Sequence, residues 1–186
     1  ALKMFEGMQL KYQPPKTTKT FIREYRLGEE TIGKYLGSAM HVFLLNLPRL
    51  EFAAFVPKGD YVTLCLLGEE IDNKLLEAFL NAPEVKQIMP LELDLARGDC
   101  QCAPRIAVEG AVQPYDDRIV FIGDCGVTRL YKDGIGAAYR TAKSAATTCV
   151  FQGIAAEDFR KHYLPACKNI ANDNLVGKVI FLVTRI

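Results

Sequence analysis

The stretch from 118 to 136 constrains the fold more than any other part of the sequence. Residues 119–122 form a short run of β-branched and aromatic side chains that ends in Gly123 and Asp124. Such a run is typical of a buried strand, and a glycine at its end allows the backbone to approach a neighbour closely. The stretch therefore predicts a strand that stops at a functional or tightly packed turn.

A glycine pair and a helix of small residues follow this strand. Gly134 comes ten residues after Asp124, Gly136 follows, and the segment 137–150 contains five alanines that allow close packing on a sheet. Gly153 is placed to end the helix. The first amides of a helix lack internal partners and carry partial positive charge. Together these features predict a site for a negatively charged group.

This pattern resembles the second flavin-binding motif of the para-hydroxybenzoate hydroxylase and geranylgeranyl reductase superfamily. The matching residues are Gly123-Asp124 and then Gly134-x-Gly136, which opens the small-residue helix. The resemblance implies that Asp124 binds a hydroxyl of the ribityl chain. It also implies that the amides around Gly134, Ile135 and Gly136 face the pyrimidine end of the flavin ring and stabilise negative charge on the reduced flavin.

The loop between the two halves of the motif departs from the family pattern. Family members carry Ala-Ala or Ala-Cys-His after the aspartate and a proline before the first glycine, whereas here stand Cys125-Gly126 and Tyr131. A tyrosine that covers the ring would affect substrate access. Lys132 and Asp133 are candidates for tuning the flavin potential, and the alternative is that they cap the loop and face water. Cys125 is interpreted as a small loop residue in preference to a redox thiol.

The resemblance implies an FAD-dependent oxidoreductase that performs hydride or electron transfer on an organic small molecule, with polyprenyl or quinone-like compounds as candidates. NAD(P) is the corresponding electron donor, although no residue identifies it. A reductase or dehydrogenase is favoured over a monooxygenase because the histidine and proline of the latter branch are missing. No catalytic acid or base stands out. The alternatives are a non-enzymatic α+β ligand-binding module and a protein-interaction module.

The first dinucleotide-binding motif of that superfamily, Gly-x-Gly-x-x-Gly, does not occur in the sequence. We therefore expect the chain to be the C-terminal portion of a flavoprotein whose N-terminal FAD-binding half is missing here. That half is the expected partner. By itself the chain is expected to bind FAD weakly and to be inactive.

The expected fold class is α+β, or α/β in the wider sense. Residues 1–112 are predicted to form an antiparallel substrate-domain sheet with packed helices. Residues 113–168 are predicted to supply the strand, loop and helix of the FAD-binding domain, and 169–186 a tail. The clearest element is a hairpin over 51–67 about the Pro-Lys-Gly-Asp turn at 57–60. In the resembled family such a hairpin lines the substrate side of the flavin.

Several further elements follow from periodicity. An amphipathic helix is predicted over 71–88, interrupted at Pro83, and another over 157–168. Residues 169–177 are interpreted as a polar break. The apolar segment 179–183 is expected to pack on the core, pair with a lost segment or touch a lipid surface, so peripheral membrane contact is one alternative.

Composition excludes several classes of function. The 23 basic residues balance the 22 acidic ones without a basic block, so no nucleic-acid partner is expected. No apolar run reaches the roughly 18 residues that span a bilayer. Of six cysteines only Cys100 and Cys102 are close, and neither histidine stands at ligand spacing, so no metal site is expected. We expect reduced, buried thiols in a cytoplasmic protein.

Overall fold

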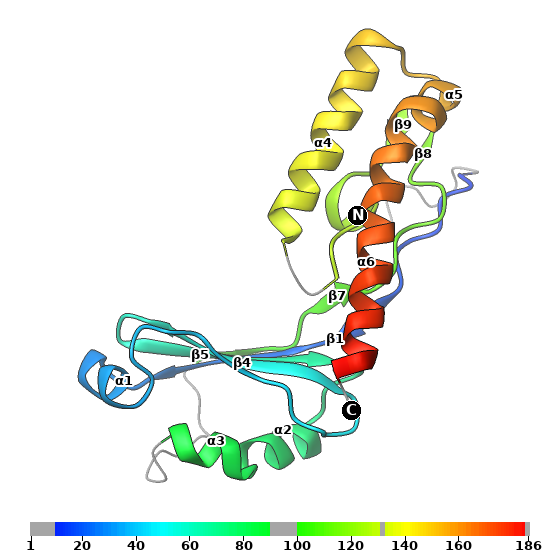
Figure 1. The fold of residues 1–186 in the computed structure, drawn as a ribbon. Helices are drawn as coiled ribbons and strands as arrows, with labels where there is room; N and C mark the ends of the chain where they lie inside the picture. The colour runs from blue at the N-terminus through cyan, green and yellow to red at the C-terminus, as the bar shows by residue number, and fades with distance from the viewer. Residues whose placement is uncertain (1–9, 90–99, 131–132, 185–186) are drawn as a thin grey trace. The chain divides into compact units, whose positions relative to one another are not determined.

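The structure is a computed structural model that describes residues 10–89, 100–130 and 133–184 (Figure 1). The described residues fall into two compact units, one of residues 18–105 and the other of residues 10–17 with 106–184. Helices and antiparallel sheets are both present, which confirms the α+β class. The boundaries 1–112, 113–168 and 169–186 stay a prediction about functional domains.

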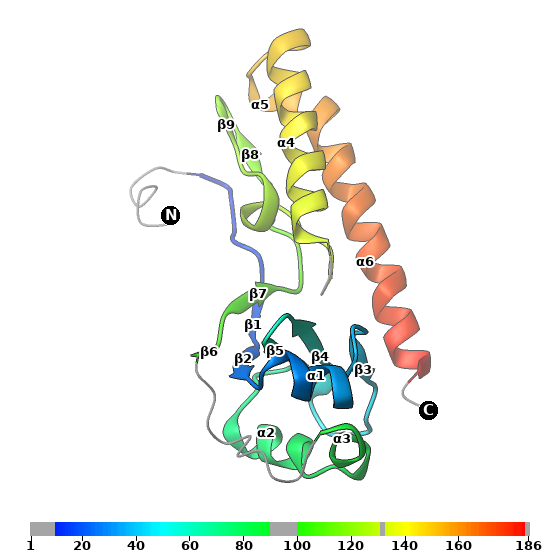
Figure 2. The same ribbon diagram turned by 90° about the vertical axis from the view of Figure 1, so that its left-hand side faces the viewer.

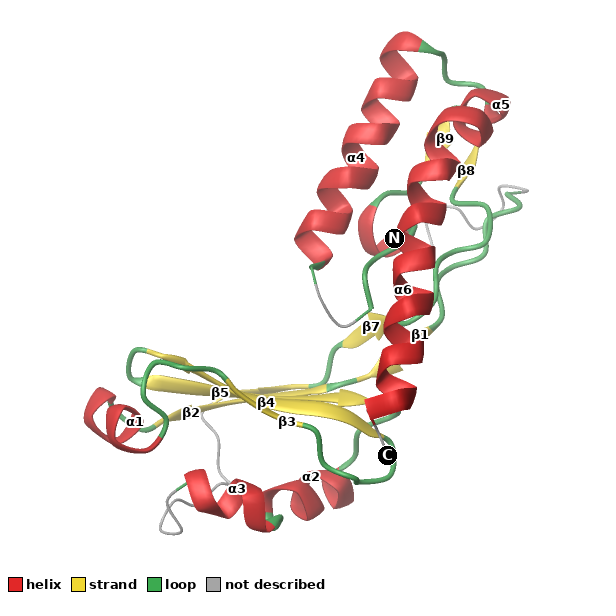
Figure 3. Cartoon of the chain, viewed as in Figure 1, coloured by secondary structure: helices red, strands yellow, loops and turns green. Residues whose placement is uncertain are grey.

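The unit of residues 18–105 is built on a five-stranded antiparallel sheet in the order β3-β4-β5-β2-β6 (Figure 3). The predicted hairpin is confirmed as its centre. It pairs Phe55 with Leu64 and turns at Gly59, whose φ of 60° suits glycine. The strands are β2 (Phe21–Arg26), β3 (His41–Phe43), β4 (Leu50–Lys58), β5 (Tyr61–Gly68) and β6 (Cys100–Cys102).

Three helices complete this unit, namely α1 (Glu29–Tyr35), α2 (Asn73–Leu80) and α3 (Pro83–Ile88). They bury one face of the sheet, where Phe55, Leu64 and Phe79 are fully enclosed. The predicted helix over 71–88 is confirmed with its interruption, since Pro83 begins α3 at a position where no amide donor is needed.

The opposite face of the sheet carries a row of small and apolar side chains. Side chains alternate between faces along a strand, and the strand register aligns one such residue from each of the five strands. The row is Val42, Ala54, Cys65, Ile22 and Cys102. Cys102 and Cys100 are exposed, so the expectation of buried thiols was wrong for this pair, as it was for Cys125 and Cys149. They lie on β6, which is the edge strand of this sheet within the part of the chain that the structure describes.

The second unit is mainly helical. Its elements are β8 (Tyr115–Asp116), β9 (Ile119–Val120), a 3₁₀ turn (Gly123–Cys125), α4 (Gly134–Phe151), α5 (Ala156–Asp158), a π-helical turn (Phe159–Tyr163) and α6 (Leu164–Thr184). Figure 2 shows α4 and α6 running side by side. Ala137 and Ala145 of α4 are buried in one cluster with Phe159, Tyr163 and Cys167. The predicted small-residue helix and the predicted buried face after 157 are therefore confirmed.

The polar break predicted over 169–177 was wrong, because α6 continues through it to Thr184. Asparagine and aspartate are weak helix formers, but here Asp173 and Asn174 bind backbone and side chains of the same unit, and these tertiary contacts outweigh propensity. The apolar segment 179–183 therefore belongs to the last turns of α6, where Val179 and Val183 are exposed.

The strand predicted at 119–122 is shorter than expected. The run at 119–122 pairs only over β9, with β8 as its partner, and the run at 40–47 pairs only over β3. β1 (Thr17–Lys19) and β7 (Arg105–Ala107) form a separate two-stranded sheet. Within the described ranges, no helix is long and apolar enough to cross a membrane.

Candidate functional site

Gly123 and Asp124 form a 3₁₀ turn that packs on α4. Gly123 has a φ of 56°, and its amide donates to the Thr141 hydroxyl at 2.9 Å. A β-carbon added at Gly123 would lie 3.2 Å from that of Ala138, so glycine permits this close approach. The Asp124 side chain is exposed and makes no hydrogen bond or ion pair with another described residue. The turn thus presents an available carboxylate beside the second turn of α4.

Two tyrosines bind backbone carbonyls in and just before this turn. The Tyr12 hydroxyl donates to the Cys125 carbonyl at 2.8 Å, and its ring stacks on Phe121 with centroids 3.8 Å apart. The buried Tyr163 hydroxyl donates to the Phe121 carbonyl at 2.5 Å. Burial raises the pKa of Tyr163 far above its ordinary value, so this hydroxyl remains a donor. A β-carbon at Gly126 would lie 2.3 Å from the Phe121 oxygen, which excludes any side chain there.

The start of α4 is capped by Asp133. This residue has left-handed backbone angles, and its Oδ1 accepts from the Gly136 amide at 3.1 Å. A β-carbon at Gly136 would lie within 2.1 Å of the same oxygen, so the glycine leaves room for the capping carboxylate. The amides of Gly134 and Ile135 have no partner among the described residues. The first turn of α4 therefore has two amides without a described partner, those of Gly134 and Ile135, next to the Gly136 amide that Asp133 caps.

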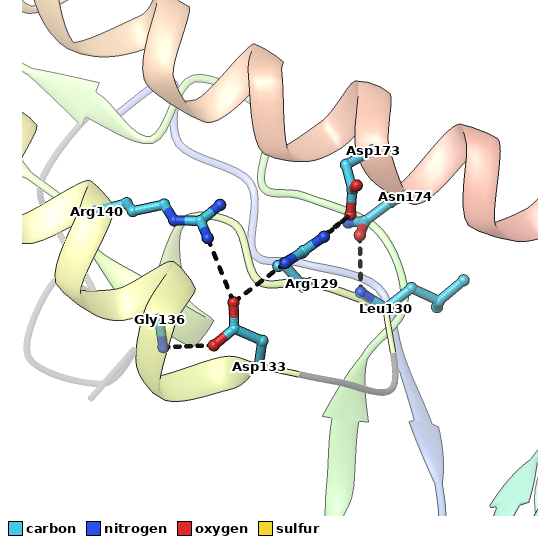
Figure 4. A network of polar contacts seen from close by, with 7 residues as sticks. All are labelled: Arg129, Leu130, Asp133, Gly136, Arg140, Asp173 and Asn174. Atoms are coloured by element: carbon cyan, nitrogen blue, oxygen red, sulfur yellow. Dashed lines mark hydrogen bonds and ion pairs between the residues drawn. The ribbon is translucent and has the colours of Figure 1, made fainter.

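Charges around Asp133 form the network shown in Figure 4. Its Oδ2 lies 3.2 Å from Arg129 and 3.6 Å from Arg140. Arg129 in turn binds Asp173 of α6 at 2.7 Å. Hydrogen bonds to Asp173 and then Asp133 raise the pKa of Arg129. The negative charge of the cap is thus compensated by two guanidinium groups.

Asn174 of α6 joins the same network through the backbone. Its Oδ1 accepts from the Leu130 amide, and its Nδ2 donates to the Thr128 carbonyl, both at 2.7 Å. The residue is only 8% exposed, so these bonds are made in a largely dehydrated place. Sequence analysis missed this residue. Continuing the buried face of Cys167 and Ile170 by one turn leads to Asn174, and that helical spacing is the signal that could have found it.

The residues predicted to bind flavin therefore occupy one compact unit. The turn with Gly123 and Asp124 packs on α4, whose first turn contains Gly134, Ile135 and Gly136 and whose cap is Asp133. Tyr131 and Lys132 lie outside the described residues. The flavin contacts of all these residues stay predictions.

A hollow of about 390 Å³ lies elsewhere along α4. Its lining residues are Arg140, Lys143, Ser144, Thr147, Thr148, Gln152 and His162. None of the predicted flavin contacts that the structure describes lines it. Among the described residues, no group of three or more histidine, cysteine or acidic side chains could hold a metal ion.

The sequence matches no protein-family model and no curated protein. Solved structures do share the fold. The p-nitrophenol 4-monooxygenase PnpA from Pseudomonas putida DLL-E4 aligns with a TM-score of 0.54 and 13% identity, over 94% of this chain and 47% of PnpA. RebC-10x with bound 7-carboxy-K252c aligns with a TM-score of 0.57 and 15% identity, over 93% of this chain and 34% of RebC.

A flavin-dependent halogenase, CmlS, is a more distant likeness, with a TM-score of 0.42 and 15% identity over 94% of this chain and 32% of CmlS. The chain spans less than half the length of each of these structures. The chain therefore has the fold of part of a larger enzyme such as PnpA. At these identities the likeness establishes the fold alone.

Proposed function

We propose that the chain is part of an FAD-dependent oxidoreductase and carries the C-terminal share of its flavin site. The observation that carries this proposal is the packing of the Asp124 turn on α4. Among the described residues, neither the Asp124 carboxylate nor the first amides of α4, those of Gly134 and Ile135, have a hydrogen-bond partner. A flavin needs an acceptor for its ribityl hydroxyls and donors for the pyrimidine end of its ring. The two elements offer these two kinds of group.

In this proposal Asp124 accepts a hydrogen bond from the ribityl chain, and the amides of Gly134 and Ile135 donate to the ring. The Gly136 amide already binds Asp133, so Gly136 contributes by making room for the cap. Bound FAD supplies the hydride or electron transfer. The N-terminal half expected from the resemblance would bind the remaining part of the dinucleotide.

Asp133 is the residue of this chain best placed to adjust the flavin potential. Its carboxylate lies at the positive end of α4, close to the guanidinium groups of Arg129 and Arg140. A negative charge there opposes the addition of electrons to a nearby ring, while the two cations reduce that effect. The flavin potential would depend on the balance of charge among Asp133, Arg129 and Arg140. Lys132 is a further candidate for adjusting it.

The substrate side is proposed for the sheet face that carries Val42, Ala54 and Cys65 in one row. The row is apolar across five strands, and the helices α1, α2 and α3 bury the other face. An apolar organic molecule, such as a polyprenyl or quinone-like compound, suits such a surface better than a charged one. NAD(P)H is the proposed electron donor, and the cytoplasm the proposed location.

Reduction or dehydrogenation of the substrate is the first candidate, since the motif lacks the histidine and proline of the monooxygenase branch. Monooxygenation is the second, and the shared fold with a p-nitrophenol 4-monooxygenase favours it. The two reactions differ in oxygen use. A reductase turns over its substrate without oxygen, whereas a monooxygenase consumes oxygen and yields a hydroxylated product.

The experiment is the absorption spectrum of the full-length protein after purification, followed by NAD(P)H oxidation with and without oxygen. We expect the visible bands of a bound flavin. A colourless protein that takes up no added FAD would refute the proposal. Such a result would leave the non-enzymatic binding or interaction module as the account of the fold.

A further inference from the structure

We propose that Asp173 and Asn174 of α6 are positioning residues for the flavin site, which they hold in place through the loop before α4. The inference rests on the proposed function. It assigns a role to the stretch of α6 that separates two apolar parts of that helix. The hydrogen bonds of Asp173 to Arg129, drawn in Figure 4, and of Asn174 to Thr128 are the two connections through which these residues act.

The first connection runs through Thr128. Asn174 fixes the Thr128 carbonyl from Nδ2 and the Leu130 amide from Oδ1, so the peptide groups between these positions have little freedom. The Thr128 hydroxyl would lie 3.7 Å from a β-carbon added at Gly134, which places it in van der Waals reach of the first turn of α4. Holding Thr128 therefore limits where α4 can begin.

The second connection runs through Arg129. Asp173 accepts from both Nε and Nη2 of Arg129, at 2.9 and 2.7 Å, which fixes the plane of the guanidinium group. The remaining terminal nitrogen reaches Asp133 at 3.2 Å. Asp133 caps Gly136, so the chain of contacts from α6 ends in the first turn of α4, which also contains Gly134 and Ile135.

The helix that supplies these contacts is itself firmly held. Cys167 and Ile170 are buried on the face of α6 that also bears Asn174. In the π-helical turn that leads into α6, Tyr163 binds the Phe121 carbonyl, two residues before Gly123. The helical segment from Tyr163 to Asn174 therefore binds the backbone at two places, one just before the Asp124 turn and one just before α4. At 1.5 Å per residue, Tyr163 and Asn174 are about 16 Å apart along the helix axis, so these two contacts hold well-separated points of the chain.

The test uses four variants of the full-length protein. Asn174→Leu removes both backbone bonds at similar volume, and Asp173→Ala removes the partner of Arg129. Asp173→Glu keeps a carboxylate that can reach Arg129 and serves as the conservative variant. Asn172→Leu is the matched control, because Asn172 is exposed on the same helix and its side chain makes no hydrogen bond with another described residue.

Two readouts separate positioning from simple stability. Amide hydrogen exchange over 127–130 reports whether α6 holds the loop, and it does not depend on flavin. The rate of flavin release and the reduction potential of the bound flavin report whether holding the loop matters to the site. We expect faster exchange and about tenfold faster flavin release in Asn174→Leu and Asp173→Ala, the ratio for one net hydrogen bond. Asp173→Glu and Asn172→Leu should stay near wild type.

Failure of this inference differs from failure of the proposed function. If the wild-type protein holds flavin and both disruptive variants release it at the wild-type rate, the positioning role is refuted and the proposed function stands. If amide hydrogen exchange over 127–130 is unchanged in Asn174→Leu, the claim that Asn174 restrains this loop is refuted. A wild-type protein that never binds flavin would refute both proposals.

Discussion

Replacing Tyr163 by phenylalanine removes a single hydroxyl and leaves the ring that fills the core of the helical unit. The ring is fully buried, and the hydroxyl donates to the Phe121 carbonyl at 2.5 Å in a buried place. The substitution therefore tests one hydrogen bond with little change in packing. We expect a less stable protein whose Asp124 turn is less well fixed.

The size of the effect follows from the environment of the bond. An ordinary protein hydrogen bond contributes about 0.5–1.5 kcal/mol, and a buried group that loses its partner costs about 1–3 kcal/mol. Because this bond is buried, we expect the free energy of unfolding to fall by about 1–3 kcal/mol. For a domain of 150–250 residues each kcal/mol lowers the melting temperature by about 2–4 °C.

The assay is urea unfolding of wild type, Tyr163→Phe and Tyr139→Phe. Tyr139 is the matched control, since its side chain on α4 is 65% exposed and its hydroxyl makes no hydrogen bond with another described residue. Its loss of the same hydroxyl should leave the unfolding midpoint unchanged. Equal midpoints for all three proteins would show that the bond to Phe121 contributes nothing, and the account of how the turn is held would be wrong.

Three further outcomes are expected. Gly126→Ala should lower the melting temperature more than Tyr163→Phe, because its β-carbon would lie 2.3 Å from the Phe121 oxygen, and a stable variant would contradict that clash. The carboxyl pKa of Glu157 is lowered to about 2 by Arg160 and then Lys161. The stabilisation it gives is therefore present above the unfolded pKa of about 4.5 and is lost as pH falls towards 2. Glu157→Gln should thus differ from wild type in melting temperature at pH 7 and match it near pH 2, and a constant difference would refute the assignment. Asp133→Asn keeps a capping side chain and removes the charge. We therefore expect the reduction potential of bound flavin to rise by about 20–40 mV in a spectroscopic titration. An unchanged potential would mean that the flavin ring does not lie near Asp133.

Local patterns predicted much of this fold. The hairpin of β4 and β5 was found because two apolar runs flank a Pro-Lys-Gly-Asp turn, and turn chemistry is a local property. The start of α4 was found because glycine and small residues mark it. Its end at Phe151, two residues before Gly153, was found by the same reasoning. The interruption at Pro83 followed from the missing amide of proline.

Contacts between distant residues were beyond the sequence. Nothing local to Asn174 shows that it binds Leu130, 44 residues away, and without that contact its neighbours read as a break in the helix. The hydrogen bond from the Tyr12 hydroxyl to the Cys125 carbonyl, 113 residues away, could not be predicted from the sequence either. For Asp133 the sequence left two interpretations open, and the structure adds that its carboxylate caps Gly136.

The central claim is that the Asp124 carboxylate and the open amides of α4 bind one flavin. It is tested most directly by the flavin content of full-length Asp124→Ala, compared with wild type and with Asp117→Ala as an exposed acidic control. The account predicts that Asp124→Ala retains flavin about 5- to 150-fold more weakly, the ratio for about 1–3 kcal/mol, while Asp117→Ala matches wild type. Equal flavin affinity in all three proteins would contradict it.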